Sequence, residues 1–294
     1  MIATMAFSTV GFFSFLFTLP LLMLHKRGLS TGKCLWVQGV SYLGVMVYTV
    51  YPYIGFFSPE NMGIILFGTV FTLISALEAL IYTAMDFRSN SVLRKLVVAS
   101  IPAFVIGGGY AAWITSPMAA VSFDGFRASV ASILENTMPS ILQSINPEML
   151  VGMMLMLMVP MAMLLGGIPV VIAEFALNCK DEQWQNDMAY MKLPAKYSVL
   201  LLVCVVLFVP AFFITSYPRV LGVIGWNCGL GLLMHFTVNG ASIFLAMRRR
   251  SNPSFSAGRV IWLFILAGFL PGINLGLCVA FSVLAVLENW VKFR

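Results

Sequence analysis

The sequence predicts an all-α protein that crosses a membrane as a polytopic bundle of about eight helices. Of its 294 residues, 60% are hydrophobic and 10% are charged, whereas a typical soluble domain has roughly 25% charged residues. The hydrophobic residues fall in runs of about twenty or more, the length that crosses a hydrocarbon core roughly 30 Å thick. Lipid offers no hydrogen bonds to peptide groups, so each run is expected to be a helix. Residues 1–294 are therefore expected to form a single integral membrane domain.

Eight long apolar segments follow one another along the chain, separated by polar joints. Two of them have clear start signals, because Ser58-Pro59-Glu60 and Asn146-Pro147-Glu148 each place a capping side chain before a proline and an acidic residue. The third and fifth spans are expected to begin there. The expected spans are 5–25, 34–57, 63–85, 96–116, 149–176, 197–217, 220–247 and 260–287.

Basic residues predict which side of the membrane each joint faces. Thirteen of the 17 Lys and Arg residues lie in alternate joints, and the positive-inside rule places such joints in the cytoplasm. With eight spans, both termini would then lie outside. Because these residues flank apolar runs, the net charge of +6 indicates membrane orientation and not nucleic-acid binding. The thirteen are Lys26, Arg27, Lys33, Arg88, Arg94, Lys95, Lys180, Lys192, Lys196, Arg248, Arg249, Arg250 and Arg259.

The last segment is the least regular of the eight. Pro271-Gly272 interrupts it, and a proline removes a backbone hydrogen bond of the helix. The segment is expected to be one kinked span, with a broken hairpin as the alternative. The hairpin would return Lys292 and Arg294 to the cytoplasmic side, which would strengthen the charge asymmetry.

Two segments outside the spans are long enough to have structure of their own. Residues 118–148 carry apolar side chains near helical spacing, which predicts an amphipathic segment on the outer membrane surface, divided near Pro139. The alternative interpretation is a lid over an outward-facing cavity. Residues 178–196 are expected to form a cytoplasmic loop.

Polar side chains inside the spans are the candidate functional residues, because an ionisable group there costs at least about 2.5 kcal/mol on insertion scales. Glu78 lies in the middle of an apolar run. His235 and Asn239 are four residues apart and share one helix face, with Asn227 two turns earlier on roughly the same face. These four residues are expected either to line a ligand or proton site or only to hydrogen-bond helices together.

Glu174 and Asn274 are secondary candidates. Glu174 lies near the inner end of the fifth span and is expected to extend to the membrane interface. Asn274 follows the Pro271-Gly272 break, where freed backbone groups could bind a ligand, although a simple kink is the plainer interpretation.

No motif indicates a catalytic, metal or cofactor site. The sequence contains no H-E-x-x-H, G-x-S-x-G or P-loop pattern. Its five cysteines form no C-x-x-C pair and are scattered, as expected of free thiols. The chain is therefore not expected to be an enzyme or to hold a cofactor.

Several motifs of the second half follow the pattern of one bacterial family. They are Gly167-Ile168-Pro169, Ala173 to Asn178, Lys192-Leu193-Pro194, Asn227, His235 to Met247, Pro271, and Leu287 to Arg294. On these motifs the chain resembles the YybS-like predicted membrane proteins, a family of unknown function. The resemblance implies a multi-pass protein of the bacterial cytoplasmic (inner) membrane.

That family is, more remotely, similar to the substrate-binding S components of energy-coupling-factor vitamin transporters. The similarity implies a transport or binding component that handles a small molecule or a lipid. Its partners would be the lipid bilayer and other membrane subunits or an ATPase, with no nucleic acid. The alternative is a non-transporting structural subunit of a cell-envelope membrane complex.

Overall fold

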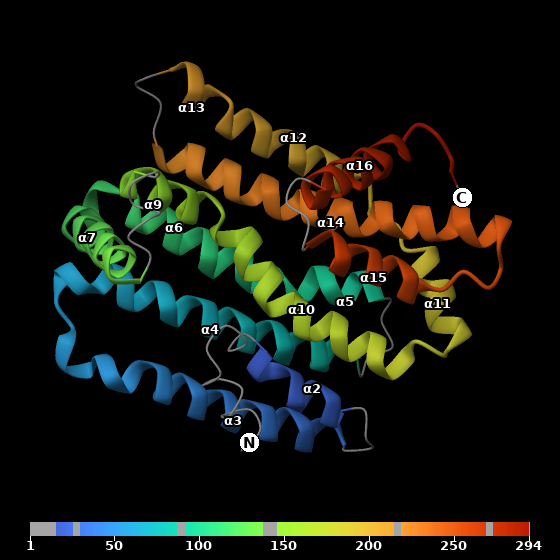
Figure 1. Cartoon of the computed structure of the whole chain (residues 1–294), viewed down its shortest axis with the longest axis horizontal. Helices are drawn as coiled ribbons and strands as arrows, with labels where there is room; N and C mark the ends of the chain where they lie inside the picture. The colour runs from blue at the N-terminus through green and yellow to red at the C-terminus, as the bar shows by residue number, and fades with distance from the viewer. Residues whose placement is uncertain are drawn as a thin grey trace.

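The computed structural model describes residues 16–25, 30–86, 92–137, 146–214, 219–268 and 273–293. Within these ranges the chain is helical and has no strand, so the predicted all-α class is confirmed. The long helices α3, α4, α10, α12 and α14 run roughly along the long axis of the molecule (Figure 1). Their bounds are α2 Leu19–His25, α3 Thr31–Val50, η2 Tyr51–Phe56, α4 Pro59–Asp86, α5 Val92–Ala99, η3 Ala103–Gly107, α6 Gly108–Ile114, η4 Pro117–Ala119, α7 Ala120–Thr137, α9 Pro147–Met156, α10 Met158–Asn178, α11 Glu182–Ala189, α12 Lys196–Phe208, α13 Pro210–Phe213, α14 Arg219–Ser251, α15 Ala257–Gly268 and α16 Ile273–Leu287.

Six of the described helical segments are long and apolar enough to cross a membrane, as in a polytopic membrane protein. They correspond to the second to seventh predicted spans, so the predicted total of about eight is not confirmed. Most of the predicted first span, 5–25, lies outside the described residues. The six are Gly32–Phe56, Pro59–Met85, Val92–Ile114, Met158–Asn178, Lys196–Phe213 and Arg219–Ser251.

Both predicted helix starts are confirmed. Helix α4 begins at Pro59, and Ser58 Oγ accepts a hydrogen bond from the backbone N–H of Asn61 at 3.3 Å. Helix α9 begins at Pro147, and Asn146 Oδ1 accepts one from the backbone N–H of Glu148 at 2.9 Å. These starts are predictable because the cap and the proline are neighbours in sequence.

Helix α14 is the centre of the C-terminal half, with α10, α12 and α16 packed around it (Figure 1). Two of its glycines allow these neighbours to approach closely. A Cβ atom at Gly225 would lie 2.9 Å from the carbonyl oxygen of Cys204 on α12, and one at Gly240 would overlap the carbonyl of Phe281 on α16. These two glycines therefore allow α12 and α16 to pack closely against α14.

Residues 118–148 contain helix α7, whose apolar face packs on protein. Phe126 and Val130 are buried in the same apolar cluster as residues of α4, α6 and α10. Ser122 Oγ donates a hydrogen bond to the carbonyl oxygen of Pro59 at 2.7 Å. The segment thus contains a helix whose apolar face covers the start of α4, and its position on the outer membrane surface stays a prediction. Pro139 lies outside the described residues.

The last segment forms a helical hairpin, which supports the alternative and not the single kinked span. Helix α15 begins beside the end of α14, and the chain after α16 returns there, since Arg250 Nη1 donates to the carbonyl oxygen of Phe293 at 3.0 Å. The rings of Phe264 on α15 and Phe281 on α16 lie 5.3 Å apart. At about 1.5 Å per residue, neither helix is long enough to cross a core of roughly 30 Å.

Basic residues gather at one end of the bundle. The end of α14 and the starts of α5, α12 and α15 lie at the right in Figure 1, with the C-terminus near them. Helices α7 and α13 lie at the opposite end. The charge asymmetry of the sequence therefore corresponds to the two ends of the structure, and the assignment of the basic end to the cytoplasm stays a prediction.

Candidate functional site

Glu78 is buried in the C-terminal half of α4, with 2% of its surface exposed. Its carboxylate packs against Gly166 of α10, where a Cβ atom would overlap Glu78 Oε2. Only glycine therefore leaves space for this carboxylate. Glu78 Oε1 has no hydrogen-bond partner among the described residues. Leaving a buried polar atom unpaired costs on the order of 1–3 kcal/mol, so the atom needs an explanation.

His235 lies on α14 and faces the fourth span. Its Nε2 is 3.0 Å from Ser100 Oγ, and its ring stacks on Phe104 with the centroids 5.9 Å apart. His235 Nδ1 has no partner among the described residues. Asn239, one turn further along α14, is also buried.

A π-helical turn, η3, interrupts the fourth span next to His235. It extends from Ala103 to Gly107, directly after Pro102. Proline has no N–H and disturbs the α-helical ladder, which favours a local change of helix type. Such π turns frequently lie at functional sites. No sequence motif marks η3 except Pro102 and the glycines that follow it.

Asn227 links α14 to the break between α9 and α10. Its Oδ1 accepts a hydrogen bond from the backbone N–H of Val159 at 2.9 Å, and its Nδ2 donates to the carbonyl oxygen of Leu155 at 2.8 Å. Its Nδ2 also lies 3.0 Å from the carbonyl oxygen of Val223 on its own helix. The amide is thus fully used within the protein, as in the helix-linking interpretation.

Glu78 and the polar residues of α14 contact different parts of the bundle. Helix α4 packs against α3, α5, α7 and α10, whereas α14 packs against α6, α10, α12 and α16. Glu78 Oε1 has no hydrogen-bond partner among the described residues, whereas His235 bonds Ser100 and Asn227 bonds Val159 and Leu155. A common site that contains all four residues stays a prediction.

Glu174 is buried in an ion pair, so it does not extend freely to the interface. Its Oε1 lies 2.9 Å from Lys95 Nζ, and the two side chains are only 4% and 7% exposed. Asn178 Nδ2 donates to the other carboxylate oxygen. Lys95 Nζ also lies 5.3 Å from the ring centroid of Tyr82, which adds a cation–π contact. The acid and the base compensate each other's charge where both are buried.

Asn274 lies in the first turn of α16. The Pro271-Gly272 break that precedes it, and the surroundings of the Asn274 side chain, lie outside the described part of the chain. Its role as a secondary candidate stays a prediction.

Further buried polar atoms lie on α4 and the adjacent helices, and the sequence interpretation missed them. Each lacks a hydrogen-bond partner among the described residues. The available signal was spacing, because Gln38 and Tyr42, like Glu78 and Tyr82, are four residues apart on one helix face. The atoms are Thr18 Oγ1, Gln38 Oε1, Tyr42 Oη and Tyr82 Oη.

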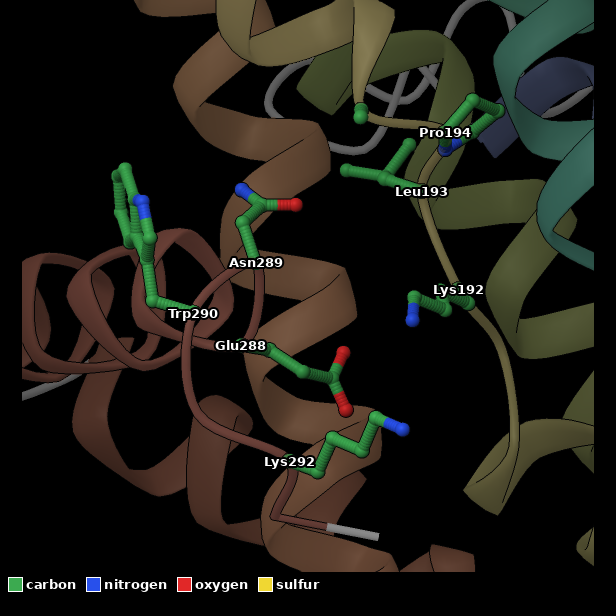
Figure 2. Close-up of a pocket in the computed structure, with 8 residues that line it drawn as sticks. Lys192, Leu193, Pro194, Glu288, Asn289, Trp290 and Lys292 are labelled. Carbon is green, nitrogen blue, oxygen red and sulfur yellow. The ribbon is translucent and has the colours of Figure 1, made fainter.

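A cavity of about 480 Å³ lies at the basic end, between the α11–α12 joint and the chain after α16. Figure 2 shows Lys192 and Lys292 on opposite sides of this space, with the Glu288 carboxylate near Lys292. Two segments that carry the family resemblance thus lie together although they are far apart in sequence. The lining residues are Lys192, Leu193, Pro194, Ala195, Glu288, Asn289, Trp290 and Lys292.

Within the described part of the chain, no three His, Cys, Asp or Glu side chains come together as a metal site would require. Comparison with known proteins finds no matching protein-family model, no matching curated protein and no matching solved structure. The resemblance to the YybS-like membrane proteins is therefore a prediction from the motifs of this sequence alone.

Proposed function

We propose that this protein is a transport or binding component that handles a small molecule or a lipid in the bacterial inner membrane, and that Glu78 contacts the ligand or carries a proton. One observation carries the proposal: Glu78 Oε1 is buried inside a span and has no hydrogen-bond partner among the described residues. An ionisable side chain within a membrane is costly, so it usually serves a substrate or proton pathway.

The neighbourhood of Glu78 supports this role. Tyr82 follows it by one helical turn, and Tyr82 and Tyr42 belong to one apolar cluster that α2, α3, α4 and α10 build. Both phenol oxygens lack partners among the described residues. Buried hydrogen-bonding groups without partners in an otherwise apolar cluster favour binding of a ligand or ordered water.

The second candidate is a non-transporting structural subunit of an envelope complex. The contacts of Asn227 favour this candidate. Its side-chain oxygen and nitrogen both form hydrogen bonds with protein groups, so neither atom is left for a ligand. In that case the polar residues of the spans would serve only to hold helices together, as interhelical hydrogen bonds do in membranes.

Mass spectrometry of copurifying molecules separates the two candidates. Wild-type protein and the variants Glu78→Gln and Glu60→Gln would be purified in a neutral detergent and extracted. Glu60 is the matched control, because it is an exposed acid at the start of the same helix. We expect one compound to copurify with the wild-type protein and with Glu60→Gln. The amount of this compound recovered with Glu78→Gln should be at least tenfold lower. Equal recovery from all three proteins, or no enriched compound, would refute the proposal.

A further inference from the structure

A second pocket, of about 350 Å³, lies where α14 ends and α15 begins, at the basic end of the bundle. It combines aromatic and cationic side chains and includes no acidic one. The lining residues are Phe244, Arg248, Ser251, Asn252, Phe255, Arg259 and Leu263.

The two arginines of this pocket are held by two phenylalanines. Arg248 Cζ lies 5.3 Å from the ring centroid of Phe244, and Arg259 Cζ lies 5.5 Å from that of Phe255. The two rings contact each other edge to face, with centroids 6.3 Å apart. Stacking on the rings leaves the N–H groups at the guanidinium edges available to an acceptor, and a guanidinium matches the oxygens of a phosphate.

The neighbouring arginines show that this availability is specific to the pocket. Arg249 Nη1 donates to Asn186 Oδ1 at 2.8 Å, and Arg250 Nη1 donates to the carbonyl oxygen of Phe293 at 3.0 Å. Arg248 and Arg259, in contrast, have no ion-pair or hydrogen-bond partner among the described residues. Two cations therefore face one pocket without a counter-charge.

The apolar part of the pocket continues onto an exposed apolar surface of α15. Leu263 is 37% exposed, and Trp262 and Leu266 on the same helix are 55% and 60% exposed. Helix α15 thus carries large apolar side chains outward directly beside the guanidinium groups. A ligand that satisfies both parts needs an anionic head and a hydrocarbon tail.

We propose that this pocket binds an anionic phospholipid, with Arg248 and Arg259 on its phosphate and the acyl chains over Phe255 and Leu263. A free phosphate would use the charges but would leave the apolar wall uncovered. Basic pockets between membrane helices on the cytoplasmic side are known to accept acidic headgroups. The proposal is independent of the role of Glu78.

The test compares two lipids that share their acyl chains. Full-length protein in a neutral detergent would be titrated with phosphatidylglycerol or phosphatidylcholine, and bound lipid would be counted by native mass spectrometry. We expect Arg248→Gln/Arg259→Gln to weaken phosphatidylglycerol binding about 30-fold, the factor for two cations near an anionic headgroup. Binding of phosphatidylcholine should not change.

Two further variants make the result specific. Lys33→Gln/Lys180→Gln removes the same charge from exposed residues outside the pocket and should weaken binding less than threefold. Arg248→Lys/Arg259→Lys keeps the positive charge but not the planar donor groups. It should weaken phosphatidylglycerol binding several-fold. If the glutamine variant does not fold, this lysine variant tests the proposal in its place. Unchanged lipid preference in both arginine variants, or an equal loss in the lysine control, would overturn the proposal. Displacement of the lipid by millimolar inorganic phosphate would also overturn it, because the site would then be one for free phosphate.

Discussion

The side-chain amide of Asn227 on α14 replaces a missing backbone hydrogen bond beside Val159 at the start of α10. In a continuous helix the N–H of Val159 would donate to the carbonyl oxygen of Leu155. Pro160 prevents this continuity, because it lacks an N–H and its ring crowds the preceding turn. The chain therefore breaks at Leu157, where φ is −100° and ψ is 8°. Asn227 provides the donor and the acceptor that the break requires inside an apolar bundle.

Replacement of Asn227 by leucine should strongly destabilise the protein. The variant leaves the Val159 N–H and the Leu155 carbonyl unpaired, and each unpaired group costs on the order of 1–3 kcal/mol. We expect the free energy of unfolding in detergent to fall by about 3 kcal/mol, measured by denaturant titration of helical circular dichroism. Asn289→Leu is the control, because Asn289 is exposed and donates its hydrogen bond to the hydroxyl oxygen of half-buried Ser198. A loss below about 1 kcal/mol for Asn227→Leu would contradict the bridging role.

The Lys95–Glu174 pair should show strong coupling in a double-mutant cycle. Lys95→Met leaves a buried carboxylate without its cation, and breaking a buried pair in this way costs about 3–5 kcal/mol. Lys95→Met/Glu174→Met removes both charges, and most of the lost stability should return. Equal and additive losses from the two single substitutions would show that the ion pair does not hold α5 to α10.

Gly166→Ala should destabilise the protein through Glu78. The added methyl group would overlap the Glu78 carboxylate, and such overpacking typically costs about 1–3 kcal/mol. In a Glu78→Ala background the same methyl group has space, so Gly166→Ala should there be nearly neutral. Thermal unfolding of the four proteins measures this difference. Equal effects of Gly166→Ala in both backgrounds would mean that Glu78 does not lie against α10.

The hairpin of α15 and α16 places the C-terminal residues on the same side as the α14–α15 joint. In a variant without the five native cysteines, single cysteines at Ser254 and Trp290 should react with a membrane-impermeant maleimide from the same face of sealed vesicles. A cysteine at Met118 should react only from the opposite face, because Met118 is 95% exposed and lies directly before α7, the helix at the other end of the bundle. If positions 254 and 290 reacted from different faces, the hairpin would be contradicted and the single kinked span would be supported.

Sequence signals predicted those parts of the fold that depend on neighbouring residues. Ser58 and Asn146 mark helix starts because cap and proline are adjacent, and the long apolar runs correspond to the helices of the bundle. The breaks and pairs were not predictable in this way. Lys95 and Glu174 are 79 positions apart, and the partners of Asn227 belong to another helix.

The candidate site likewise has a part that residue spacing predicted and a part that depends on contacts between helices. The spacing of His235 and Asn239 correctly placed both residues on one buried face. Helical periodicity does not indicate which helix this face contacts. In the structure, Ser100 and Phe104 of the fourth span contact His235. The glycine that makes space for Glu78 lies on α10, and no pattern in one sequence connects these two positions.

Chemical modification of Glu78 tests the central claim most directly, namely that this carboxyl group lies unpaired within the membrane. A hydrophobic carbodiimide enters lipid and reacts with carboxyl groups, and peptide mapping by mass spectrometry locates the adduct. In protein embedded in lipid nanodiscs we predict one dominant adduct on Glu78, no adduct on the Lys95-bound Glu174, and loss of the adduct in Glu78→Gln. An unmodified Glu78, or modification of Glu174 to the same extent, would contradict the account.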